Sequence, residues 1–163
     1  MRRLTLFIVV LSLFLAMCEK GKDVTPKSSQ AVRIGLVLSV GGLGDKSFND
    51  SAFEGLMRAK EKLGIIPIYG QPEQMAEDEK YLRQYAEQGM DLVIAVGFLM
   101  KDALEKVAKE FPETRFAIID AVVDEPNVAS LVFREHEGSF LVGAIAGLVT
   151  KTNKVGFVGG MDI

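Results

Sequence analysis

The sequence has one cysteine and one histidine among its 163 residues. A single cysteine excludes an intrachain disulfide, and a single histidine excludes a histidine-rich metal site. The formal net charge is −3, so the chain lacks the basic excess that is typical of nucleic-acid-binding proteins. We therefore expect no metal and no nucleic-acid partner.

Motifs that bind phosphates or cofactors are also missing. The sequence has no G-x-x-x-x-G-K-[ST] loop, and residues 42–47 keep two glycines of the dinucleotide fingerprint but end on serine. No acidic residue follows Tyr69 where a ribose would need one. His136 without a serine elbow does not make a catalytic triad. We expect no cofactor and no enzyme activity; a nucleotide-dependent α/β enzyme is the alternative.

The first 17 residues have the pattern of a signal peptide. Two arginines precede an apolar run at 4–16, which is short for a membrane-spanning helix of about 20 residues. The run ends in Leu15-Ala16-Met17-Cys18, which resembles a bacterial lipobox. We expect cleavage before Cys18 and lipid attachment to it; a plain secretory signal with an incidental cysteine is the alternative.

A polar stretch at 18–30 separates this leader from the folded part. It holds one proline and no apolar period, as expected of a flexible tether. The protein is therefore predicted to be lipid-anchored at the cell membrane, facing the periplasm or the cell exterior. We expect one lobe at 31–153 and the start of a second lobe at 154–163, so the sequence reads as the first part of a longer protein.

Apolar runs alternate with helical periodicity from residue 32 onward. This alternation predicts an α/β fold with a doubly wound parallel sheet, in the order 2-1-3-4-5. Pro67 favours an edge position for the second strand. Leu63 and Met75 occupy inward positions of their helices, and small residues in the last helix predict close packing on a neighbour. The expected strands lie at 32–38, 65–69, 91–96, 115–119, 128–133 and 154–158, and the helices at 48–63, 73–88, 100–110 and 137–150.

The carboxyl ends of parallel strands meet at one edge of a sheet, where ligands bind. Several polar or aromatic residues fall there, and more than one role is open for each. Phe48 is a core residue or a stacking surface, and Asp45 caps backbone N–H groups or faces the cleft. Asn49, like Ser47, is a possible helix cap, or it contacts a ligand. The candidate ligand-binding residues are Ser39, Asp45, Phe48, Asn49, Gly97, Phe98 and Asp120.

Four strings of this sequence resemble the basic membrane protein family of PnrA-like bacterial lipoproteins. They are G-G-L-G-D-K-S-F-N at 41–49, A-I-I-D at 117–120, F-R-E-H-E-G-S-F-L-V-G at 133–143 and V-G-F-V-G-G-M at 155–161. The resemblance runs from about residue 32 to the last residue. It implies the first lobe of a type I periplasmic-binding fold. It also implies a substrate-binding protein of an ABC importer, with a permease and an ATPase as partners and a purine nucleoside held between two lobes.

The resemblance also assigns roles to single residues. The aromatic residue of the D-K-S-F-N string, Phe48, would stack on the base, and Asn49 and Asp120 would lie at the ligand. Ser39 stands where the family usually has an aspartate that binds ribose hydroxyls. A serine can still hydrogen-bond a hydroxyl, but it lacks the charge-assisted bond of a carboxylate. A sensor or adhesin that kept the fold without transport is a further alternative.

Overall fold

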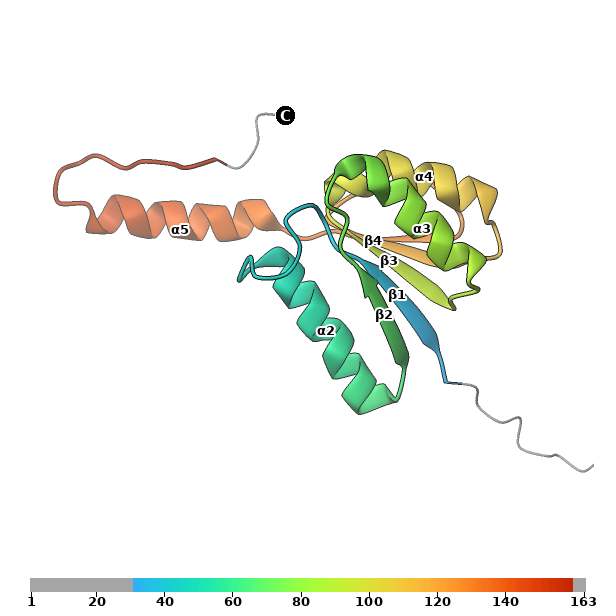
Figure 1. Ribbon diagram of the computed structural model, residues 1–163. Coiled ribbons are helices and arrows are strands. Elements are labelled where there is room, and N and C mark those ends of the chain that lie inside the picture. The colour runs from blue at the N-terminus through green and yellow to red at the C-terminus, as the bar shows by residue number, and fades with distance from the viewer. Residues whose placement is uncertain (1–30, 160–163) are drawn as a thin grey trace, which may run out of the picture. The chain divides into compact units, whose positions relative to one another are not determined.

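Five strands and four helices follow one another in the part of the chain that the structure describes. This computed structural model describes residues 31–159, so the predicted leader, Cys18 and the tether lie outside the described residues. The strands are β1 (Arg33–Val37), β2 (Ile66–Gly70), β3 (Leu92–Val96), β4 (Phe116–Ile119) and β5 (Val128–Leu131). The helices are α2 (Phe48–Leu63), α3 (Asp78–Glu87), α4 (Lys101–Glu110) and α5 (Glu135–Val149), with 3₁₀ turns η1 (Met75–Glu77) and η2 (Phe98–Met100) (Figure 1).

The strands form one parallel sheet in the order β2-β1-β3-β4-β5. This confirms the predicted class and strand order. Parallel neighbours need a crossover connection, which α2, α3 and α4 supply between the first four strands. β2 is an edge strand, where Pro67 does not interrupt a ladder on its free side. β1 and β3 are adjacent, so their carboxyl ends lie together.

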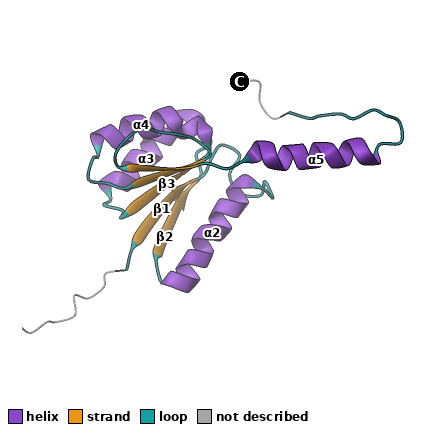
Figure 2. Cartoon of the chain, turned by 180° about the vertical axis from the view of Figure 1, so that it is seen from behind, coloured by secondary structure: helices purple, strands orange, loops and turns teal. Residues whose placement is uncertain are grey.

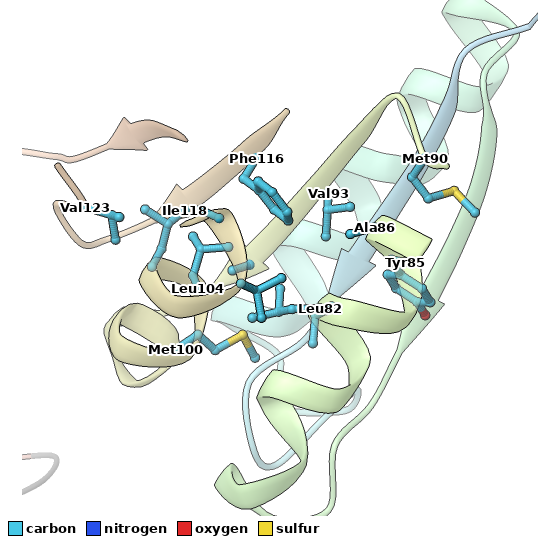
Figure 3. Close-up of a cluster of buried hydrophobic side chains, with 14 residues drawn as sticks. Leu82, Tyr85, Ala86, Met90, Val93, Met100, Leu104, Phe116, Ile118 and Val123 are labelled. Atoms are coloured by element: carbon cyan, nitrogen blue, oxygen red, sulfur yellow. The ribbon is translucent and has the colours of Figure 1, made fainter. Parts of the chain in front are cut away.

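Successive residues of β1 pack on opposite faces of the sheet. Val37 belongs to the larger buried cluster, with residues of α3 and α4, whereas Leu36 and Leu38 belong to a second cluster with α2. α3 and α4 thus cover one face and α2 the other (Figure 2). In the larger cluster, Leu82 of α3 and Met100 of η2 lie against the strand residues Val93 and Ile118 (Figure 3). The central strands β1, β3 and β4 are largely buried, as the apolar runs predicted, whereas the edge strands β2 and β5 are partly exposed.

Two strand glycines let α3 approach the sheet closely. A Cβ on Gly35 would lie 2.6 Å from the ring of Tyr85, and one on Gly70 would lie 2.5 Å from the ring of Tyr81. Any larger residue at either position would push α3 outward. The two glycines therefore fix the distance between α3 and the strands β1 and β2, and β1 is one of the strands whose ends carry the candidate site.

Two inward positions were predicted wrongly. Leu63 is 76% exposed, because it is the last residue of α2 and the left-handed Gly64 turns the chain away immediately after it. Met75 is 53% exposed, and the single helix expected at 73–88 is instead η1 followed by α3. The tighter 3₁₀ turn changes the rotation per residue, so a helical phase extended back from Leu82 misplaces Met75.

The end of the described chain also differs from the prediction. Residues 154–158 form no strand. α5 has no buried residue, although its small residues predicted close packing. Both predictions depended on neighbours: a strand needs a partner for its N–H and C=O groups, and a helix needs a surface to pack on. Among residues 31–159, no helix combines the length and the hydropathy needed to cross a membrane.

Candidate functional site

A hollow of about 170 Å³ lies at the carboxyl ends of β1, β3 and β4. It is lined by Ser39, Phe48, Gly97, Phe98, Leu99 and Asp120. The structure thus brings together five of the seven residues predicted to bind a ligand. Asn49 lies beneath Ser39 rather than in the lining, and Asp45 lies in the turn before α2.

A larger hollow of about 610 Å³ runs along α5 and residues 155–157. Its lining is mostly glycine and apolar side chains, with Glu135 and Ser139 as its polar members. Ligand sites need several convergent polar groups to orient a solute. The smaller hollow combines aromatic rings, a hydroxyl and a carboxylate, and we therefore take it as the candidate site.

Ser39 and Asn49 are joined by two hydrogen bonds. The backbone N–H and the hydroxyl of Ser39 both donate to Asn49 Oδ1, at 2.9 and 3.0 Å. Asn49 is 3% exposed although it belongs to the first turn of α2. A buried amide oxygen must be hydrogen-bonded to be tolerated, and Ser39 satisfies it.

Asp45 holds the start of α2. Its carboxylate accepts hydrogen bonds from the backbone N–H groups of Ser47 at 2.8 Å, Asn49 at 2.8 Å and Asp50 at 3.2 Å. The N–H groups of Asn49 and Ser47 hold the pKa of the Asp45 carboxyl below its ordinary value. The structure favours the capping role that the sequence left open. It also corrects the expectation for Ser47, whose side chain makes no capping hydrogen bond.

Two aromatic rings reach the hollow from different elements. Phe48 opens α2 and is 38% exposed, and Phe98 opens η2 and is 39% exposed. Gly97 lies between Phe48 and Ser39: a Cβ there would be 3.5 Å from Phe48 Cε1 and 3.6 Å from Ser39 Cβ. Its φ of +100° and ψ of 153° belong to a region that is essentially restricted to glycine. The exposed rings are available to a flat ligand.

Asp120 follows β4 directly and has a left-handed backbone, with φ of +67°. Its N–H donates to Leu131 O at 2.8 Å, which holds it beside the end of β5. Burial raises the pKa of Asp120, and the nearby carboxylate of Glu135 raises it further. Strained non-glycine residues cluster at functional sites. Glu135 was not chosen as a ligand-binding residue, although its position shortly after the end of the neighbouring strand β5 predicts that it lies at the same edge of the sheet.

No group of three or more histidine, cysteine, aspartate or glutamate side chains suited to a metal ion occurs in the described part of the chain. The site therefore rests on Ser39, Asp120 and the two phenylalanine rings. These groups can stack on a planar ring and accept hydrogen bonds.

The chain matches the family model described as "ABC transporter substrate-binding protein PnrA-like" over residues 31–163. It is 37% identical over 136 residues to the ABC transporter nucleoside-binding protein BmpA of Lactococcus lactis, covering 80% of this chain and 39% of that protein. It is 36% identical over 173 residues to an uncharacterized lipoprotein of Pyrococcus abyssi, covering all of this chain and 43% of that protein. The chain therefore spans less than half the length of these relatives.

Solved structures show the same relationship. A solute-binding protein of an ABC transporter system from Aeropyrum pernix superimposes with a TM-score of 0.68 and 43% sequence identity. The superposition covers 71% of this chain and 32% of that protein. The predicted fold class and the predicted family are both confirmed by these comparisons.

Proposed function

We propose, on the premise that this chain belongs to the family of PnrA-like substrate-binding proteins of ABC transporters, that it binds a purine nucleoside for import. The ligand would lie between two lobes, and the described residues form one side of the site. The bound protein would deliver its solute to a permease driven by an ATPase. No bond in the solute is broken in this role.

The observation that carries the proposal is the lining of the 170 Å³ hollow. Phe48 and Phe98 offer flat apolar surface to a heterocyclic base. Ser39 and Asp120 lie in the same lining and offer polar groups to hydroxyls or ring N–H groups. The name of the Lactococcus lactis relative, a nucleoside-binding protein, supports the same class of solute.

We also propose that Cys18 carries a lipid that anchors the protein to the membrane. The apolar run at 4–16 ends at the lipobox-like string. The Pyrococcus abyssi relative, which aligns with the whole chain, is named a lipoprotein. An anchored protein with a polar tether would stay close to its permease.

The proposal is tested by calorimetry on the full-length protein with nucleosides, free bases and sugars. Replacing Phe48 by alanine removes both the stacking and the contact area of the ring. That loss is worth on the order of 2–3 kcal/mol, or roughly 30- to 150-fold in affinity. Val40→Ala is a matched control, because Val40 is 43% exposed nearby but does not line the hollow.

Two results would reject the nucleoside assignment: no nucleoside binds, or Phe48→Ala binds nucleosides as tightly as the unchanged protein. Tight binding of a sugar without a base would point to another solute in the same fold. If the protein binds a nucleoside but cells that lack the protein take up nucleosides normally, the sensor or adhesin alternative is favoured.

A further inference from the structure

The orientation of the Asn49 side-chain amide is fixed by the backbone. The N–H of Ser39 lies 2.9 Å from Asn49 Oδ1. A backbone N–H can only donate a hydrogen bond, so the amide must turn its oxygen, and not its NH₂ group, toward Ser39. The usual ambiguity between the oxygen and nitrogen of an asparagine is therefore resolved at this position.

The same oxygen fixes the hydroxyl proton of Ser39. Ser39 Oγ lies 3.0 Å from Asn49 Oδ1. Since an amide oxygen can only accept, the hydroxyl group must donate its proton to Asn49. What remains on Oγ is its lone pairs. Ser39 lines the hollow, so it faces a ligand as a hydrogen-bond acceptor.

Neighbouring groups hold this pair in place. Asn49 is 3% exposed, and its backbone N–H donates to Asp45 Oδ2 at 2.8 Å. On the other side, Gly97 brings its backbone against Ser39, whose Cβ would lie 3.6 Å from a Cβ at position 97. The pair is therefore built into the start of α2 and the turn after β3, and not left to a freely rotating side chain.

We propose that Asn49 is a positioning residue that holds the hydroxyl proton of Ser39, so that Ser39 selects ligands carrying a hydrogen-bond donor against it. This inference rests on the proposed function for its choice of ligand, a nucleoside with a sugar hydroxyl at that point. Asp120, the other polar side chain of the lining, is an acceptor when ionised. No lysine or arginine belongs to the lining that the structure describes.

Affinity measurements separate this role from direct contact between Asn49 and the ligand. Calorimetry compares adenosine with 2′-deoxyadenosine and 3′-deoxyadenosine. We expect the unchanged protein to bind at least one deoxy analogue about 3- to 10-fold more weakly, the range for losing one neutral hydrogen bond. Ser39→Ala should bring that ratio close to one. Asn49→Ala should reduce the ratio too. It should cost less affinity in the Ser39→Ala background than alone, because only the backbone N–H of residue 39 then loses its acceptor.

Two further variants guard against a trivial effect on folding. Asn49→Asp keeps an oxygen toward the N–H and hydroxyl of Ser39 and replaces the NH₂ group by a second oxygen, which adds a negative charge. It should therefore keep the preference for the hydroxyl, whatever the charge does to the overall affinity. Ser51 lies in α2 about one turn after Phe48 and does not line the hollow. Ser51→Ala should therefore change neither the affinity for adenosine nor the ratio between adenosine and its deoxy analogues. Two results would overturn the inference. One is that Asn49→Ala costs the same affinity whether residue 39 is serine or alanine; the other is that Ser39→Ala leaves the ratio of adenosine to deoxyadenosine affinity unchanged.

A neutron structure of the deuterated, ligand-free protein tests the hydrogen bond without any ligand. We expect the deuterium of the Ser39 hydroxyl between Oγ and Asn49 Oδ1. A deuterium directed into the hollow, or ND₂ of Asn49 facing Ser39, would overturn the inference even if nucleosides bind. If no nucleoside binds at all, the proposed function and the ligand selection both fail, and the neutron map still decides the role of Asn49.

Discussion

Asp78 is a buried carboxyl group whose ionisation should weaken the fold at neutral pH. It is the first residue of α3 and is 2% exposed. Its Oδ1 atom has no hydrogen-bond partner among the described residues. Burial, and to a smaller extent the charge of Glu77, raises the pKa of Asp78 from its ordinary 3.8 to about 6. The folded protein therefore holds this proton more tightly than the unfolded chain.

The direction of the pH dependence follows from this difference. Well below pH 3.8 the carboxyl is protonated in both states and carries no penalty. Stability is lost as the pH rises from about 3.8 to about 6, and above that range the loss no longer grows. A tenfold change in proton affinity is worth about 1.4 kcal/mol, so the rise from 3.8 to about 6 amounts to about 3 kcal/mol at pH 7. The helix N-terminus favours a carboxylate by about 0.3–1 kcal/mol, which is too little to reverse the sign.

Asp78→Asn removes the charge and keeps the shape of the side chain. We expect it to stabilise the full-length protein by about 1–2 kcal/mol at pH 7.5, since the buried NH₂ group also needs a partner and offsets part of the gain. At pH 4.5 the two proteins should differ much less. Urea unfolding at both pH values measures the difference. Asp102→Asn is the matched control, because Asp102 occupies the first turn of α4 and is exposed. A difference between Asp78→Asn and the unchanged protein that is the same at both pH values would refute the reasoning.

Three further outcomes are expected. Gly97→Ala should destabilise the protein by about 1–3 kcal/mol, because φ of +100° with ψ of 153° strains any other residue. Thermal unfolding measures the change. The control Gly55→Ala in α2, where a Cβ would meet open space, should not destabilise the protein. Glu135→Gln should lower the pKa of Asp120, so ligand affinity should fall at a lower pH; an unchanged pH profile would contradict this. Cys18→Ser should release the protein from the membrane fraction, and unchanged fractionation would disprove lipid attachment.

The sheet could be predicted because its signals are local and agree with one another. Strands buried on both faces require continuous apolar runs, and the helices between them force parallel pairing. Pro67 marked the edge strand, and it lies on one. The candidate site followed from the sheet, since parallel strands place Ser39, Gly97 and Asp120 at one edge.

The rest could not be predicted, because it depends on partners that the sequence does not identify. The apolar run at 154–158 is not a strand among the described residues. A strand forms only when its backbone N–H and C=O groups hydrogen-bond to an adjacent strand. Asp78 is an acidic residue in the first turn of a helix, a position that is usually exposed to solvent. In α3 it is instead buried, on the same face as Leu82 and Tyr85. The capping role of Asp45 depends on the shape of a glycine turn that residue type alone does not specify.

Position 39 shows how a neighbour decides what a side chain can do. A serine carries no negative charge, unlike an aspartate, and by itself it could either donate or accept a hydrogen bond. The hydroxyl of Ser39 donates a hydrogen bond to Asn49 Oδ1 at 3.0 Å. Toward a ligand, Ser39 therefore keeps the accepting role that a carboxylate would have, but its hydrogen bond is that of a neutral group and weaker. Ser39→Asp would place a carboxylate against that same oxygen, where two acceptors repel. Turning the Asn49 amide to relieve the repulsion would deprive the N–H of Ser39 of the acceptor it has at 2.9 Å. A carboxylate at position 39 therefore adds its charge to the site at the cost of one of these two contacts, and the net change in nucleoside affinity, measured by calorimetry, is smaller than the charge alone would give.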